Sequence, residues 1–111
     1  MSKYEIYQLD WSADESVIRN FAFRPFQDVI KDGFSISKDR YSLVYTMESE
    51  TDLSLEDLYY IFNMERPADF KGHSLSVSDV VGNSDGFWYC DSFGWKRLDW
   101  EREFGKSRRR L

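Results

Sequence analysis

A pair of aspartates is the first candidate for chemistry in this sequence. Asp79 and Asp91 stand on either side of a predicted β-hairpin, where paired strands can bring them together. Two carboxylates at one point can hold Mg²⁺, as in a nuclease. No lysine or glutamate at a fixed spacing completes such a site. We therefore favour turn capping for both aspartates and keep a metal-dependent enzyme acting on nucleic acid as the alternative.

The segment after His73 offers a weaker catalytic pattern. His73 is the only histidine, and Ser74, Ser76 and Ser78 follow it. A catalytic serine needs a base and an oxyanion hole, and adjacency in sequence does not place an imidazole on a hydroxyl. Hydroxyls together with the carboxylate of Asp79 are typical of a tight bend held by bonds from side chain to backbone. We expect such a bend, and no hydrolase chemistry.

The single cysteine excludes a disulfide within the chain. Cys90 follows three aromatic residues in a strand-like run, so we expect a buried apolar filler and not a nucleophile. One cysteine and one histidine lack the ligand spacing of a structural zinc site. No glycine pattern for phosphate binding occurs. The sequence thus predicts no cofactor and no metal.

Apolar periodicity predicts the elements that position these residues. Strands are predicted over residues 4–10, 41–47, 75–77, 80–91 (as a hairpin) and 95–98. Amphipathic helices are predicted over residues 25–33 and 55–63, the second with a capping arrangement of Ser54 and Asp57. Its apolar stripe consists of Leu55, Leu58, Tyr59 and Phe62. Residues 15–21 fit either a helical turn or the start of an extended segment.

This order of elements predicts an α+β fold. A chain of 111 residues allows one domain. We expect a largely antiparallel sheet with two short helices packed on one face. The domain should span residues 1–104, followed by a basic flexible tail at 105–111.

The charge is uneven along the chain. Against 20 acidic residues stand 15 basic ones, and four of these lie in the tail, which leaves residues 1–104 with a net charge of −9. This sign disfavours direct nucleic-acid binding, which needs clustered cations. Binding through the tail at Arg108–Arg110 is a third, weaker reading.

A protein partner suits the acidic body better. Five carboxylates lie close together in sequence, and three aromatic residues are expected to stay exposed. The expected partner-binding residues are Glu48, Glu50, Asp52, Glu56, Asp57, Tyr60, Trp95 and Trp100. An acidic face can compete with nucleic acid for the groove of a basic protein and gain association rate by steering. A merely solvated loop remains the other interpretation.

The expected location is the cytoplasm. No run reaches the roughly 20 apolar residues of a membrane helix. Residues 1–12 lack the basic start and apolar core of a secretion signal.

Several strings together resemble the YodL-like domain family. The most specific are SLSVSDVV at residues 74–81 and YCDSFGW at 89–95, and residues 41–45, 55–63 and 66–70 agree with them. The resemblance covers about residues 4 to 100. Cys90 replaces the usual branched apolar residue, and Trp95 stands where phenylalanine is commoner.

The resemblance implies a context and not a mechanism. The family occurs in conjugative elements and phages of Gram-positive and gut bacteria, sometimes beside antirestriction domains. It supplies no catalytic residues to carry over. We therefore expect a non-enzymatic protein-interaction module, specifically a small inhibitor of a host defence nuclease of the antirestriction or anti-CRISPR type. Partner identity and oligomeric state stay open.

Overall fold

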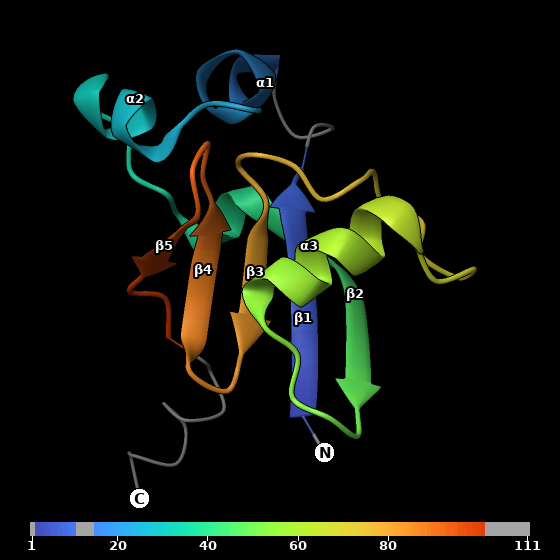
Figure 1. The fold of residues 1–111 in the computed structure, drawn as a ribbon. Coiled ribbons are helices and arrows are strands. Elements are labelled where there is room, and N and C mark those ends of the chain that lie inside the picture. Colours follow the sequence, from blue (N-terminus) through green and yellow to red (C-terminus); the bar gives the residue numbers. More distant parts are fainter. Residues whose placement is uncertain (1, 11–14, 102–111) are drawn as a thin grey trace, which may run out of the picture.

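The computed structural model describes residues 2–10 and 15–101, which form an α+β domain (Figure 1). One antiparallel sheet has the strand order β2-β1-β3-β4-β5. The strands are β1 (Ser2–Leu9), β2 (Tyr41–Ser49), β3 (Val80–Asn83), β4 (Gly86–Cys90) and β5 (Trp95–Leu98). The helices are α1 (Glu15–Phe21), α2 (Phe26–Lys31), a 3-10 turn (Lys38–Arg40) and α3 (Leu55–Met64). The predicted fold class is confirmed, and residues 15–21 are helical.

The helix α3 covers one face of the sheet, in front of β1 and β3 in Figure 1. Ile6 and Val81 face each other across β1 and β3 and pack against Leu58 and Phe62 of α3. These side chains are almost fully buried. Burial of a large apolar side chain contributes about 1.5–3 kcal/mol, so this contact fixes α3 on the sheet.

The opposite face is covered by the segment that contains α2. Tyr7, Val80 and Tyr89 form a cluster on this face, and Phe26 of α2 and Trp100 pack against it. In Figure 1, α1 and α2 lie beyond the ends of the strands. Of the described helices, α3 alone packs on its face of the sheet, so the two predicted helices do not share one face.

The start of α3 follows its sequence closely. Ser54 accepts a hydrogen bond from the Asp57 backbone, and the Asp57 side chain accepts one from the Ser54 backbone, so the predicted capping box is confirmed. The predicted apolar stripe differs at one position. Leu58 and Phe62 point at the sheet, whereas Tyr59 is 45% exposed. Ile61, and not Tyr59, packs against the core beside Leu58 and Phe62. Tyr59 therefore lies on the solvent side of the helix.

Residues 75–77 do not form the predicted strand. The chain is bent there by side-chain hydrogen bonds, although Leu75 still inserts into the core. Alternation of apolar and polar residues misled the prediction. The Ser76 hydroxyl donates to the Ser74 carbonyl oxygen and the Ser76 N–H donates to the Asp79 side chain, and these local bonds compete with strand pairing. The bend that the same serines predict is present, and the chain resumes as β3.

Candidate functional site

The bend before β3 is a turn closed at both ends. The Asp79 backbone N–H donates to the Ser76 carbonyl oxygen at 3.0 Å, and the Ser76 N–H donates to Asp79 Oδ2 at 2.8 Å. Ser78 has φ of 91°, the left-handed region that the third residue of a type II turn needs and that glycine usually fills. Ser78 and Asp79 both bond to the backbone of Cys90. Two residues therefore oppose one, which is a β-bulge.

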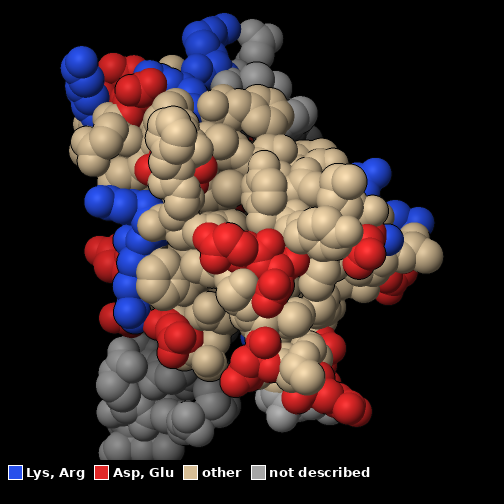
Figure 2. Space-filling model, in the orientation of Figure 1, with Lys and Arg blue, Asp and Glu red and all other residues tan. Residues whose placement is uncertain are grey.

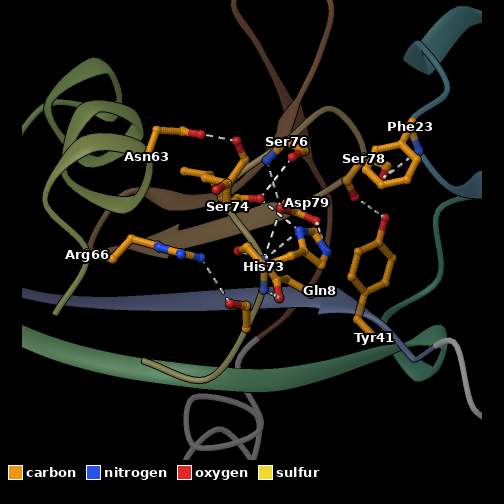
Figure 3. A network of polar contacts seen from close by, with 12 residues as sticks. Gln8, Phe23, Tyr41, Asn63, Arg66, His73, Ser74, Ser76, Ser78 and Asp79 are labelled. Atoms are coloured by element: carbon orange, nitrogen blue, oxygen red, sulfur yellow. Dashed lines mark hydrogen bonds and ion pairs between the residues drawn. The ribbon is translucent and has the colours of Figure 1, made fainter. Parts of the chain in front are cut away.

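Asp79 is the centre of a buried polar network (Figure 3). Its side chain is 1% exposed, and Oδ2 also accepts from Gln8 Nε2 at 3.1 Å. The Gln8 amide donates in addition to the His73 carbonyl oxygen at 2.8 Å and accepts from the His73 N–H at 3.3 Å. Burial raises the pKa of Asp79 well above its ordinary value, against the opposing effect of these hydrogen bonds.

His73 completes the network through its ring. Nδ1 lies 2.7 Å from the Ser74 carbonyl oxygen, which can only accept, so Nδ1 carries the proton. Nε2 faces Asp79 Oδ1 at 3.7 Å. This separation is longer than a hydrogen bond, so the bond between Nδ1 and the Ser74 carbonyl oxygen is the one that orients the ring.

Further bonds tie the bend to its surroundings, as Figure 3 shows. Asn63 of α3 donates to the Leu75 carbonyl oxygen at 3.0 Å. On the other side, the Tyr41 hydroxyl donates to the Ser78 carbonyl oxygen at 2.6 Å, and the Phe23 N–H donates to Ser78 Oγ at 3.1 Å. The segment thus joins helix α3, strand β2 and the loop after α1. The hydrogen bonds of this segment therefore hold these elements together.

Asp91 also caps backbone N–H groups, but in a different place. Its Oδ1 accepts from Phe26 at 3.0 Å and from Ser92 at 2.8 Å. Phe26 begins α2, whose N-cap position is Pro25 and has no side-chain cap, so Asp91 supplies the cap from a distant segment. The predicted turn-capping roles are therefore found for both aspartates. Within residues 2–10 and 15–101, no three His, Cys, Asp or Glu side chains gather as a metal-ligand set.

A groove lies between α3 and the turn from β4 to β5. Its volume is about 480 Å³, within the range that holds ligands or peptide side chains. The lining residues are Glu56, Tyr59, Tyr60, Asn63, Met64, Val77, Cys90, Asp91, Ser92, Gly94 and Trp95.

The outer wall of the groove is apolar and open to solvent. Tyr59, Tyr60 and Met64 are 45%, 54% and 70% exposed. Phe93 stands between two lining residues at the tip of the β4–β5 turn and is 95% exposed. Sequence reasoning missed Tyr59, Met64 and Phe93. An aromatic residue in an Asp-Ser-Phe-Gly turn was the available signal, since the tip of a tight turn has no core to face.

The groove is negatively charged. Glu56 and Asp91 are in its lining, which contains no Lys, Arg or His. Figure 2 shows acidic side chains gathered where α3 begins, while Lys and Arg follow the left edge, the side of β5 in Figure 1. The groove, whose lining includes Glu56, therefore lies beside this acidic cluster.

The predicted partner-binding residues are brought together only in part. Glu56, Tyr60 and Trp95 line the groove. Glu48, Glu50, Asp52 and Asp57 are exposed outside its lining, where Asp52 accepts a hydrogen bond from Ser2 and Asp57 belongs to the capping box.

The prediction that the Trp100 ring stays exposed is wrong, because the ring is partly buried. Its ring packs edge-on against Tyr7 and Tyr41, and Nε1 donates to the Ile36 carbonyl oxygen at 2.9 Å. Trp95 is also only partly exposed, since it packs against the core beneath α3.

Cys90 is buried, as predicted, with 3% of its surface exposed. Burial, followed by the charges of Asp79 and Asp91, raises the pKa of its thiol to about 12. The thiolate that a nucleophile needs is therefore disfavoured. The predicted basic tail at 105–111, with Arg108–Arg110, lies outside the described residues.

The structure is thus a small α+β domain with an open apolar groove next to a polar network centred on Asp79. The model of the YodL-like domain family matches residues 3–100, and the chain belongs to this family. No curated protein and no solved structure matches the chain. Among the helices of the described residues, none has the length and apolar character to cross a membrane.

Proposed function

We propose that the chain is a non-enzymatic protein-interaction module that docks on a partner through the groove between α3 and the β4–β5 turn. The observation that carries the proposal is the exposure of large apolar side chains around one hollow, above all Tyr60 and Phe93. Exposed apolar side chains gathered in one place favour a partner that covers them.

Charge and family context favour one kind of partner. Glu56 and Asp91 give the groove a negative potential, which steers a basic protein surface toward it. Nucleic-acid-binding enzymes present such surfaces to phosphate. The YodL-like family occurs in mobile elements and phages, so the proposed partner is a cytoplasmic defence nuclease of the host, and the module acts as its inhibitor.

A plating assay tests this function. The chain is expressed in a host that carries an active restriction or interference system, and the plating efficiency of a susceptible phage is measured. We expect the wild-type chain to raise plating and Tyr60→Ala to abolish the effect. Leu43→Ala is the matched control, because Leu43 is 51% exposed on β2 and lies outside the groove lining. Equal protection by the Tyr60 variant would contradict the proposal.

The metal-dependent alternative rests on Asp79 and Asp91, which cap separate backbone segments. Calorimetry with Mg²⁺ and Mn²⁺ distinguishes the two functions. We expect no saturable heat for the wild-type chain. Saturable binding that disappears in Asp91→Asn would favour the enzyme.

A further inference from the structure

We infer that the groove recognises an arginine side chain of the partner, presented beside an apolar residue. This inference rests on the proposed docking function and names the chemistry of the docked segment. It starts from the composition of the lining, in which carboxylates and aromatic rings stand together without a basic residue.

The carboxylates select a cation. Glu56 lies in the first turn of α3, and Asp91 follows β4 on the opposite wall. Asp91 uses Oδ1 for its two backbone bonds, and Glu56 is exposed. A neutral or acidic side chain in the groove would leave this potential uncompensated, whereas a cation is attracted from both walls.

The rings select arginine over lysine. Tyr59, Tyr60 and Trp95 contribute aromatic surface to the same hollow. A guanidinium group is planar and weakly hydrated, stacks on aromatic faces and donates paired hydrogen bonds to carboxylates, while an ammonium is a strongly hydrated point charge. Guanidinium groups lie over aromatic rings elsewhere in the described residues: that of Arg97 is 5.4 Å from the Trp88 ring centre, and that of Arg40 is 4.6 Å from the Phe21 ring centre.

The apolar residue beside the arginine is inferred from the exposed apolar side chains at the groove, Met64 and Phe93. Met64 of the lining is 70% exposed, and Phe93, which stands between the lining residues Ser92 and Gly94, is 95% exposed. Neither side chain offers an arginine a carboxylate or an oxygen acceptor. Methionine adapts to differently shaped apolar groups. A docked segment therefore gains most when an apolar side chain covers Met64 or Phe93 while the arginine enters between the carboxylates.

Selection from a library of short peptides tests the inference. The library is screened against the full wild-type chain, and peptides that bind it but not Tyr60→Ala are kept as groove ligands, with Leu43→Ala as the control that should bind normally. Each selected arginine is then replaced by lysine and by citrulline, which keeps the shape and removes the charge. We expect arginine in the selected peptides, a loss of at least about tenfold in affinity with citrulline, and a smaller loss with lysine.

A second variant probes the carboxylates without altering the rings. Glu56→Gln should lower the preference for arginine over citrulline by about tenfold or more while leaving a residual apolar affinity. Both variants are at exposed positions, and circular dichroism checks that they fold.

The possible outcomes separate the two proposals. Groove ligands without arginine, or with equal affinity after citrulline replacement, would overturn the inference and leave the docking function standing. Absence of any peptide that depends on Tyr60 would contradict both. A second copy of the chain is one more possible occupant, and light scattering of the chain alone measures whether it forms a dimer. A dimer that Tyr60→Ala dissociates would assign the groove to a second copy and overturn the inference.

Discussion

The polar network around Asp79 and the groove beside α3 are neighbouring regions that differ in burial. Polar side chains are buried in the first, and apolar side chains are exposed in the second. In the network, Asp79 is 1% exposed and its side chain accepts hydrogen bonds from Gln8 and from the Ser76 N–H. In the groove, large apolar side chains are open to solvent, and Tyr60 and Met64 are 54% and 70% exposed. The residues that look catalytic in the sequence serve the fold, and the residues that look like core packing are available to a partner.

Val77 and Asn63 connect the two regions. Both line the groove, and Asn63 also holds the bend through the Leu75 carbonyl oxygen. Asn63 thus links the bend to the lining of the groove. The comparison predicts that substitutions in the network change stability, and substitutions in the groove change binding.

The largest expected effect is loss of the Asp79 carboxyl group. In Asp79→Ala the Gln8 amide and the Ser76 N–H lose a buried acceptor, and each unsatisfied donor costs about 1–3 kcal/mol. We expect a loss of about 3 kcal/mol or more in the free energy of unfolding, measured by urea denaturation. Asp79→Asn is the matched control, because its amide oxygen can accept the same bonds, and at pH 4 it should remain close to wild type. Equal losses in both variants would break the comparison.

Removal of the Phe93 ring should weaken binding and leave stability almost unchanged. Because Phe93 is 95% exposed, Phe93→Ala should change the free energy of unfolding by less than about 0.5 kcal/mol. Its affinity for a groove-binding peptide should fall about tenfold, since exposed aromatic anchors carry a large share of interface energy. Denaturation and fluorescence anisotropy measure the two quantities. A destabilised fold with unchanged affinity would place Phe93 among the structural residues.

Asp91 caps α2 and also lines the groove, so it sharpens the comparison. Asp91→Ala removes the cap of α2 and should cost about 1 kcal/mol of stability. Asp91→Asn keeps an oxygen for the Phe26 N–H but removes the charge, so stability should be nearly retained while the preference for arginine weakens. Denaturation and peptide titration of the two variants separate these roles. Retained arginine preference in Asp91→Asn would show that its charge does not act in the groove.

The smallest expected effect is a pH dependence at Asp79. Its pKa is raised by folding, so the folded state binds this proton more tightly than the unfolded state. The resulting contribution to stability is present at low pH and is lost as the pH rises from about 3.8 through the raised pKa. The stability of Asp79→Asn relative to wild type should therefore increase with pH across this window. A constant difference in urea denaturation between pH 4 and 7 would show that Asp79 does not titrate there.

Much of the fold could be predicted from local patterns. Apart from the strand predicted over residues 75–77, the predicted strands, the capping box at Ser54 and the burial of Cys90 agree with the structure, because they depend on short-range propensity and composition. The bend at Ser76–Asp79 was also visible, because the residues that close it are three apart.

The site was harder to predict because its contacts join distant segments. Gln8 meets His73 and Asp79 across 65 and 71 positions, which no spacing rule shows. Tyr59 fits a helical core stripe equally well, and only the way α3 packs on the sheet exposes it. Trp100 was misplaced for the same reason, since its cover comes from Tyr7 and Tyr41.

The most direct measurement of where this protein acts is photo-crosslinking in host cells. A benzophenone amino acid replaces Tyr60 in the groove or, as the control, Leu43 on β2, both of which are more than half exposed. We expect a discrete adduct with a nucleic-acid-binding protein from position 60, lost on addition of Glu56→Gln, and none from position 43. An adduct from position 43 alone, or equal adducts from both positions, would contradict a function located in the groove.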